Sequence, residues 1–131
     1  MLLMRANIKN LLREFLWRTV DWLSVLVPVR KVHTSVRCLI VRLDHLGDFV
    51  LWVGLVPYFT KFFGSKPVLV CSDKNAAFAG CLDFFSDVIG VNADKYKRNV
   101  IYRFKTNRQI KQLHAHYCVQ PTYSRSTFEG D

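Results

Sequence analysis

From residue 36 onward, apolar positions follow two alternating patterns along the chain. Short continuous apolar runs at 38–43, 68–71, 88–91 and 117–120 predict buried strands. Longer stretches with helical spacing predict helices at 48–63, 75–85 and 97–114. Gly64 and Pro67 end the first of these helices, and Asp73 or Asn75 can cap the second. This alternation predicts an α/β fold with a Rossmann-like parallel sheet and flanking helices, because parallel neighbours need a crossover connection.

The first thirty residues follow a helical pattern that ends near Pro28. Charged residues interrupt this segment too often for a bilayer crossing or for the apolar region of a signal peptide. Two interpretations stay open: the helix packs on the rest of the protein as a brace, or it lies in the surface of a membrane. Its apolar stripe consists of Ile8, Leu11, Leu12, Phe15, Leu16, Trp22, Leu23 and Leu26.

The charge balance indicates an anionic partner. The chain has 19 Lys and Arg against 10 Asp and Glu, a formal net charge of +9, which attracts nucleic acid, anionic lipid or a phosphorylated substrate. The basic residues gather in the first segment and in residues 95–111. In the membrane interpretation, aromatic side chains enter the headgroup boundary while basic side chains contact anionic lipid. The membrane-contact residues are then Arg5, Lys9, Arg13, Phe15, Trp17, Arg18 and Trp22.

The length of 131 residues allows one compact domain. We expect an amphipathic basic helix and linker at 1–35, followed by a partial Rossmann-like domain at 36–131. The four cysteines form no C-x-x-C pair and no cluster with His, so they predict reduced thiols in a cytosolic protein, and no metal is assigned. Three of them fall in predicted strands, where a thiol behaves as a small apolar group.

The polar turn after the first strand carries the candidate chemistry. Its sequence is DHLGD, residues 44–48, and parallel sheets bind ligands beyond the carboxyl ends of their strands. Residues 72–75 and 121–125 are expected at the same edge. Gly47 permits a close approach or a backbone conformation that a Cβ would forbid. From spacing alone, Asp48 is either a charge that interacts favourably with the helix dipole or a functional carboxylate.

Nucleotide-binding loops are a poor match for this turn, because it contains Gly47 alone and neither G-x-G-x-x-G nor a phosphate-binding G-x-x-x-x-G-K-[ST] sequence. The segment CLIVRLDHLGDFVLWVGLVPYF instead resembles the N-terminal segment of the family 9 glycosyltransferases, the heptosyltransferase-like enzymes of lipopolysaccharide core assembly. Those enzymes begin with an apolar strand, a basic residue, a short polar turn ending in Gly-Asp, and an apolar helix with a proline. DVIGVN and CVQPTYSR are similar to the family's third strand and to its fourth strand with a polar loop.

The resemblance covers residues 36–131 and implies the N-terminal half of a GT-B fold. In that family this half holds a lipid-linked acceptor, and a second domain holds the nucleotide-activated sugar, which is transferred with inversion and without an essential metal. Asp48 would be the general base that takes a proton from the acceptor hydroxyl. The implied acceptor-binding residues are Asp44, His45, Gly47, Tyr123, Ser124 and Arg125.

The expected partners follow from the resemblance and from the first helix. The resemblance implies a glycolipid acceptor and a donor domain supplied in trans. The composition of the first helix adds an anionic inner-membrane surface, for a cytoplasmic protein that is peripheral at the inner membrane. No cofactor is expected in this chain, since the nucleotide sugar belongs to the second domain. The sequence stops at Asp131, where the family continues, so we expect a fragment, a split protein or a truncated enzyme with little transfer activity alone.

Three questions stay open. The first is whether Asp48 is basic enough, because a carboxylate at a helix N-terminus is a weak base unless burial or a second carboxylate opposes the dipole. Asp44 is the candidate for this second carboxylate. The loop at 121–125 is either an acceptor contact or solvated surface. The chain is alternatively a basic α/β module for nucleic acid or a scaffold for a partner domain, although nucleic acid is less favoured because no RNA-binding motif interleaves aromatic and basic residues.

Overall fold

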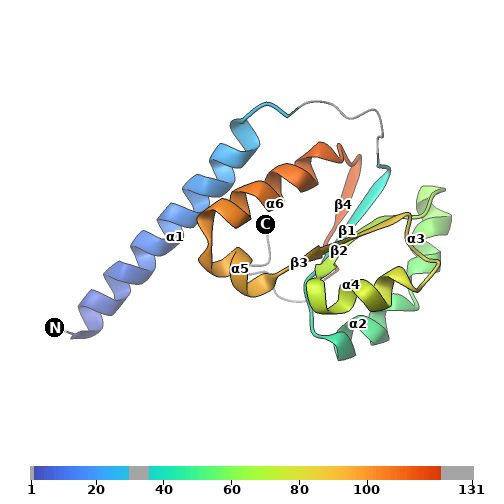
Figure 1. The fold of residues 1–131 in the computed structure, drawn as a ribbon, viewed down its shortest axis with the longest axis horizontal. Helices are drawn as coiled ribbons and strands as arrows, with labels where there is room; N and C mark the ends of the chain where they lie inside the picture. The colour runs from blue at the N-terminus through green and yellow to red at the C-terminus, as the bar shows by residue number, and fades with distance from the viewer. Residues whose placement is uncertain (1, 30–35, 122–131) are drawn as a thin grey trace.

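The computed structural model describes residues 2–29 and 36–121, with the side chains of the first helix described from residue 8 onward. Its centre is a four-stranded sheet in the order β3-β2-β1-β4, in which every neighbouring pair is parallel (Figure 1). This confirms the predicted Rossmann-like parallel sheet. The strands are β1 (Cys38–Arg42), β2 (Val68–Ser72), β3 (Asp87–Val91) and β4 (Tyr117–Val119).

Helices flank both faces of the sheet (Figure 1). One face carries α2 (Leu46–Val53), α3 (Val56–Phe63) and α4 (Asp73–Gly80). The other carries α5 (Ala93–Arg98) and α6 (Val100–Gln112), and α1 (Leu2–Leu26) packs against α6. The core therefore divides into two parts, one on each side of the sheet.

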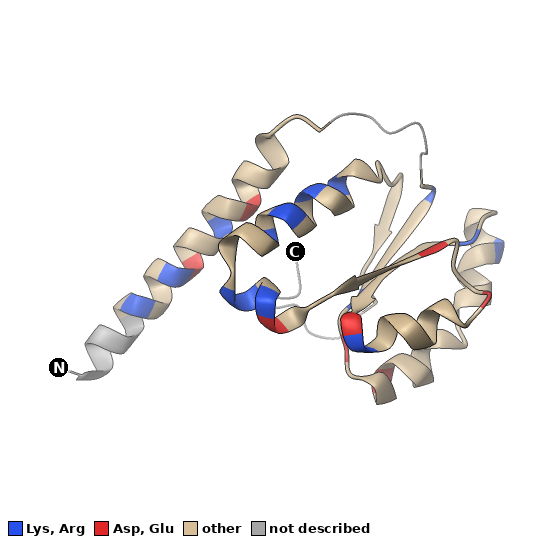
Figure 2. Ribbon diagram, in the orientation of Figure 1, with Lys and Arg blue, Asp and Glu red and all other residues tan. Residues whose placement is uncertain are grey.

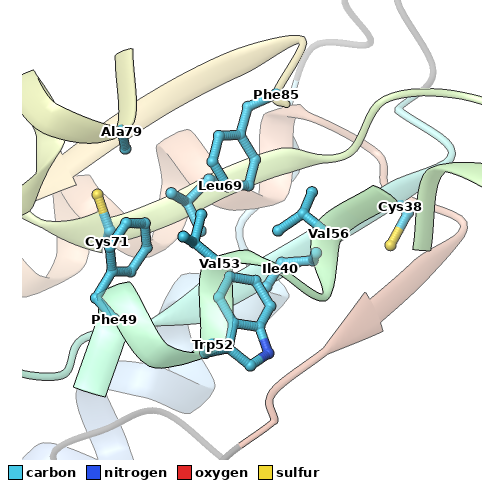
Figure 3. Close-up of a cluster of buried hydrophobic side chains, with 10 residues drawn as sticks. All are labelled: Cys38, Ile40, Phe49, Trp52, Val53, Val56, Leu69, Cys71, Ala79 and Phe85. Carbon is cyan, nitrogen blue, oxygen red and sulfur yellow. The ribbon is translucent and has the colours of Figure 1, made fainter. Parts of the chain in front are cut away.

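Alternation along the central strands builds these two cores, because successive strand residues point to opposite faces. Ile40 and Leu69 belong to the core beneath α2, α3 and α4, where they meet Phe49 and Val56 (Figure 3). Leu39, Val68, Val70 and Val91 point the other way and pack with Tyr96 of α5. Buried strands of this kind explain why the sequence shows continuous apolar runs rather than an apolar–polar alternation.

The helix predicted at 48–63 is in fact two helices, α2 and α3, bent by 51°. The break falls at Gly54 and Leu55, and Pro57 occupies the first turn of α3. Proline has no N–H to continue the hydrogen-bond ladder of α2, but it is favoured at the start of a helix. Gly64 ends α3 in the left-handed conformation, with φ of 71°, as its position predicted.

The long basic helix predicted at 97–114 is also divided, into α5 and α6. Asn99 separates them in an extended conformation, and its side chain accepts a hydrogen bond from the Tyr102 N–H (3.0 Å). Asparagine is a strong N-cap residue, so it starts a new helix instead of continuing the old one. The predicted helix at 75–85 begins earlier, at Asp73, and neither Asp73 nor Asn75 is its N-cap.

Within the described residues, no single helix has both the length and the apolar composition needed to cross a membrane. The bent pair α2 and α3 passes the same test when the two helices are taken together. Four residues of this pair, Phe49, Trp52, Val53 and Val56, are nonetheless buried in the core of the fold.

Candidate active site at the carboxyl edge of the sheet

The turn that joins β1 to α2 lies at the carboxyl edge of the sheet, where the sequence placed it. The backbone carbonyl of His45, the N-cap residue, accepts a hydrogen bond from the Phe49 N–H (3.0 Å) and so starts α2. The His45 side chain makes no capping bond. Asp48 lies in the first turn of α2 with an exposed side chain, while the next residue, Phe49, is fully buried. Phe49 therefore anchors the helix and Asp48 faces outward.

Arg42 links the turn to the segment that follows β4. Its guanidinium forms an ion pair with Asp44 and donates a second hydrogen bond to the Pro121 carbonyl (2.7 Å). It also lies over the Trp52 ring, 5.1 Å from the centroid. Both charged side chains are mostly buried, which strengthens their attraction compared with a surface pair. Two of the three segments predicted at this edge are thus held together by one side chain.

Asn75 joins the third segment to the same turn. It is almost completely buried in α4, and its amide donates a hydrogen bond to the Asp44 carbonyl (3.0 Å). The residues after β1, β2 and β4 therefore meet at one edge, as predicted, as far as Pro121. Tyr123, Ser124 and Arg125 lie outside the described residues.

The surroundings of Asp44 differ from the sequence-based expectation. Asp44 was the candidate for a second negative charge beside Asp48, but its charge is offset by Arg42. An ion-paired carboxylate repels a neighbouring carboxylate less than a free one does. Asp44 therefore shapes the turn, through its side chain to Arg42 and its carbonyl to Asn75.

Gly47 has no role in the packing of the described chain. A Cβ at this position would meet nothing within 4 Å, and the backbone is not in the left-handed region. Of the two roles expected for Gly47, the special backbone conformation is therefore not used in this turn. What Gly47 provides is open space next to Asp48, at the edge where ligands bind in parallel sheets.

A hollow of about 870 Å³ lies on the opposite side of the sheet, between α1, α6 and the strands. Val41, Leu43 and Val70 contribute apolar walls, and Lys111 and Asp21 contribute charge. None of the residues of the turn from Asp44 to Asp48 lines it. Asp48 is therefore not part of this hollow, and residues 45–48 are all exposed at the edge of the sheet.

The face that α1 turns toward α6 differs from its apolar stripe. From residue 8 onward, the buried residues of α1 are Trp17, Val20 and Ser24, which share one helix face at a spacing of three and four residues. Asp21, on the same face, accepts hydrogen bonds from Arg103 Nε (2.6 Å) and Asn107 Nδ2 (2.9 Å). The brace interpretation of the first helix therefore holds for this face.

This packing removes one residue from the predicted membrane contact. Trp17 is 4% exposed, and the Arg103 guanidinium lies 5.3 Å from the centroid of its ring, so its side chain cannot reach a lipid surface. Arg13 lies one turn before Trp17 on the same side of the helix but is exposed. Lys9, Phe15, Arg18 and Trp22 are exposed, and the side chain of Arg5 is outside the described part.

Basic residues of α6 hold the end of α1. Lys111 donates hydrogen bonds to the Val25 and Val27 carbonyls, and Arg108 donates one to the Pro28 carbonyl (3.3 Å). Carbonyls at a helix C-terminus have no partner within the helix and carry partial negative charge. The helix predicted at 97–114 therefore contacts α1 through three of its basic residues, namely the buried Arg103, Arg108 and Lys111 (Figure 2).

Outside the turn, the groups that could form a metal site or a disulfide are the described His, Cys, Asp and Glu side chains. Among the described residues, no three His, Cys, Asp or Glu side chains come close enough to hold a metal ion. The four cysteines are free, with Cys38 and Cys71 buried in β1 and β2 and with Cys81 and Cys118 exposed.

A comparison of the chain with family models, curated proteins and solved structures finds no match.

Proposed function

We propose that this chain is the acceptor-binding part of an inverting glycosyltransferase, which transfers a heptose-like sugar from a nucleotide sugar to a lipopolysaccharide-type glycolipid. The observation that carries the proposal is the position of Asp48, exposed in the first turn of α2 beyond the carboxyl end of the central strand β1. In this role Asp48 takes the proton from the acceptor hydroxyl that attacks the sugar. The resemblance of residues 36–131 to the family 9 glycosyltransferases supports the same assignment.

The open edge fits an enzyme whose active site lies between two domains. The described turn supplies an exposed carboxylate, Asp48, and open space at Gly47. A donor domain, in cis or in trans, would supply the nucleotide-sugar site and close this edge. Closure would also exclude water from the reacting groups.

The alternative, a basic module that binds nucleic acid through residues 95–111, has less support. Arg103 is buried, and Arg108 and Lys111 donate to carbonyls near the end of α1. These three side chains serve the contact between α1 and α6, so the basic surface that remains on α5 and α6 is smaller than the sequence suggested.

The test is binding of a lipopolysaccharide core oligosaccharide stripped of its acyl chains, followed by NMR on the isotope-labelled chain. We expect shift changes centred on residues 44–48. Gly47→Val fills the open space and should weaken binding by about tenfold, which corresponds to about 1.4 kcal/mol. Gly54→Val is the matched control, because Gly54 is also free of neighbours within 4 Å but lies at the other end of α2. An equal effect of both variants, or shifts confined to another surface, contradicts the site.

Asp48→Asn separates binding from chemistry. It removes the base and keeps the size of the side chain, so oligosaccharide binding should persist, whereas transfer in the presence of a donor domain should fall by about 10²- to 10⁴-fold. The chain alone, mixed with nucleotide heptose and acceptor, should show no transfer. Transfer by the chain alone would contradict the assignment of the donor site to another domain.

A further inference from the structure

The apolar stripe of α1 faces away from the protein. All eight of its residues are exposed, with relative exposures between 49% and 73%. At 3.6 residues per turn the stripe lies opposite the face of Trp17, Val20 and Ser24 that packs on α6. The ion pair of Asp21 with Arg103 fixes this rotation of the helix, so the strongest apolar surface of α1 is held outward.

The stripe also extends beyond the body of the protein. Contacts that bury α1 begin at Trp17, whereas every described side chain from Ile8 to Leu16 is exposed. Figure 1 shows the N-terminal half of α1 projecting past α5 and α6. An extended flat surface can therefore reach the stripe without meeting the α/β domain first.

Charges are arranged around the stripe in a definite way. Lys9 and Arg18 are exposed and lie on its two opposite borders. The two acidic residues of the described part of α1, Glu14 and Asp21, are seven residues apart and so share the other side of the helix. Positive charge thus borders the stripe directly, and Glu14 lies outside the stripe, one turn before Arg18.

We propose that α1 docks the protein on an anionic lipid bilayer, with the apolar stripe in the headgroup boundary and with Lys9 and Arg18 against lipid phosphates. Basic borders around an apolar face match an anionic bilayer surface. A second copy of α1 would instead bring two stripes with the same basic borders together, which is less favourable than contact with an anionic surface. The inference does not depend on the transferase proposal.

Docking is tested with the full chain and two kinds of vesicle, pure phosphatidylcholine and phosphatidylcholine with about one third phosphatidylglycerol. We expect cosedimentation with the anionic vesicles and a loss of binding at high salt. Phe15→Ser with Trp22→Ser should lower the bound fraction by about tenfold, because it removes two exposed aromatic side chains from the stripe. Lys9→Gln with Arg18→Gln should lower binding to the anionic vesicles while the stripe stays intact.

A matched control removes the same amount of apolar surface elsewhere. Leu51 on α2 and Phe62 on α3 are 84% and 83% exposed, so Leu51→Ser with Phe62→Ser should bind like the native chain. Circular dichroism checks that all variants fold. Failure of the native chain to bind anionic vesicles, or equal loss in both serine pairs, overturns the proposal.

Tryptophan fluorescence gives a second measurement on the same complex. Of the three tryptophans, Trp17 and Trp52 are buried and Trp22 is 69% exposed, so a blue shift on vesicle binding reports on Trp22 and should vanish in Trp22→Phe. Light scattering tests whether a second copy of the chain covers the stripe instead of lipid. A native dimer that Phe15→Ser with Trp22→Ser converts to monomer, without vesicle binding, would show that the stripe pairs two copies and would overturn the lipid assignment.

Discussion

At the scale of single residues, Arg103 is the one charged side chain that is fully buried in the described chain. It lies between the rings of Trp17 and Tyr96, 5.3 Å and 4.6 Å from their centroids, and donates to Asp21. Burial lowers the pKa of Arg103, but the hydrogen bond to Asp21, followed by the charges of Tyr96 and Asp21, outweighs it, so the pKa is raised overall. Burial also raises the pKa of Tyr96. The contact between α1 and α6 is thus centred on a charge that needs its partner.

Asp21→Ala should therefore destabilise the protein more than an ordinary surface substitution. It leaves the buried guanidinium of Arg103 without its carboxylate, which costs about 3–5 kcal/mol in fully buried pairs. Asp21 is 34% exposed, so water compensates part of the loss, and we expect a decrease of about 2 kcal/mol in the free energy of unfolding. Urea denaturation measures it. The control is Glu14→Ala, one heptad earlier on the same side of α1, and a similar loss there would show that the pair is not the cause.

At the scale of elements, the strands could be predicted from the sequence and the limits of the helices could not. Continuous apolar runs such as residues 38–41 and 68–71 fit strands buried on both faces. The helices at 48–63 and 97–114 were expected to be continuous because helical periodicity persists across Gly54 and Asn99. Both helices break for local reasons. A proline follows Gly54 in the first turn of α3, and Asn99 caps α6.

The candidate site, like the elements, could be predicted from the sequence only in part. Parallel topology alone places residues 44–48 and 72–75 at one edge, and this could be predicted. The roles of Arg42 and Asn75 were missed, although an arginine inside an apolar strand is a signal that a buried charge needs a partner. The outward face of α1 could not be foreseen, because the ion pair of Asp21 with Arg103 depends on a residue 82 positions away.

Two buried thiols, Cys38 in β1 and Cys71 in β2, should make the protein less stable as the pH becomes alkaline. Burial, with smaller effects from Cys118 and Asp73, raises the pKa of Cys38 and of Cys71 from 9.0 to about 11. Between these values the unfolded chain loses protons that the folded chain keeps, so the stability present below about pH 9 declines as the pH rises toward 11. Each thiol contributes a slope of about 1.4 kcal/mol per pH unit.

The measurement is urea unfolding at a series of pH values from about 8 to about 10.5. Cys71→Ala should remove about half of the slope that the two thiols produce, whatever it costs in packing at neutral pH. Cys81→Ala is the control, since Cys81 is exposed, and it should leave the slope unchanged. The same pH dependence in all three proteins would show that the buried thiols are not responsible.

At the scale of the whole molecule, the two layers of helices are joined through the sheet and through one helix pair. Trp52 reports on the core beneath α2, and Trp17 reports on the contact of α1 with α6. Hydrogen bonds from Lys111 and Asn107 reinforce that contact. Because Arg103 is buried only while α1 is docked on α6, undocking α1 exposes surface that α6 otherwise covers. We therefore expect α1 and the α/β domain to unfold together.

Two proteins with a single tryptophan test this cooperativity. One keeps Trp17 and carries Trp22→Phe with Trp52→Phe, and the other keeps Trp52 and carries Trp17→Phe with Trp22→Phe. Within each protein, the fluorescence and circular dichroism transitions should have the same midpoint in urea, as two-state unfolding requires. Adding Asp21→Ala should move the Trp17 transition to lower urea than the loss of helix and sheet, because α1 then undocks first. Separate midpoints already in the parent proteins would mean that α1 is an independent unit whose outward stripe is not held in place by the domain.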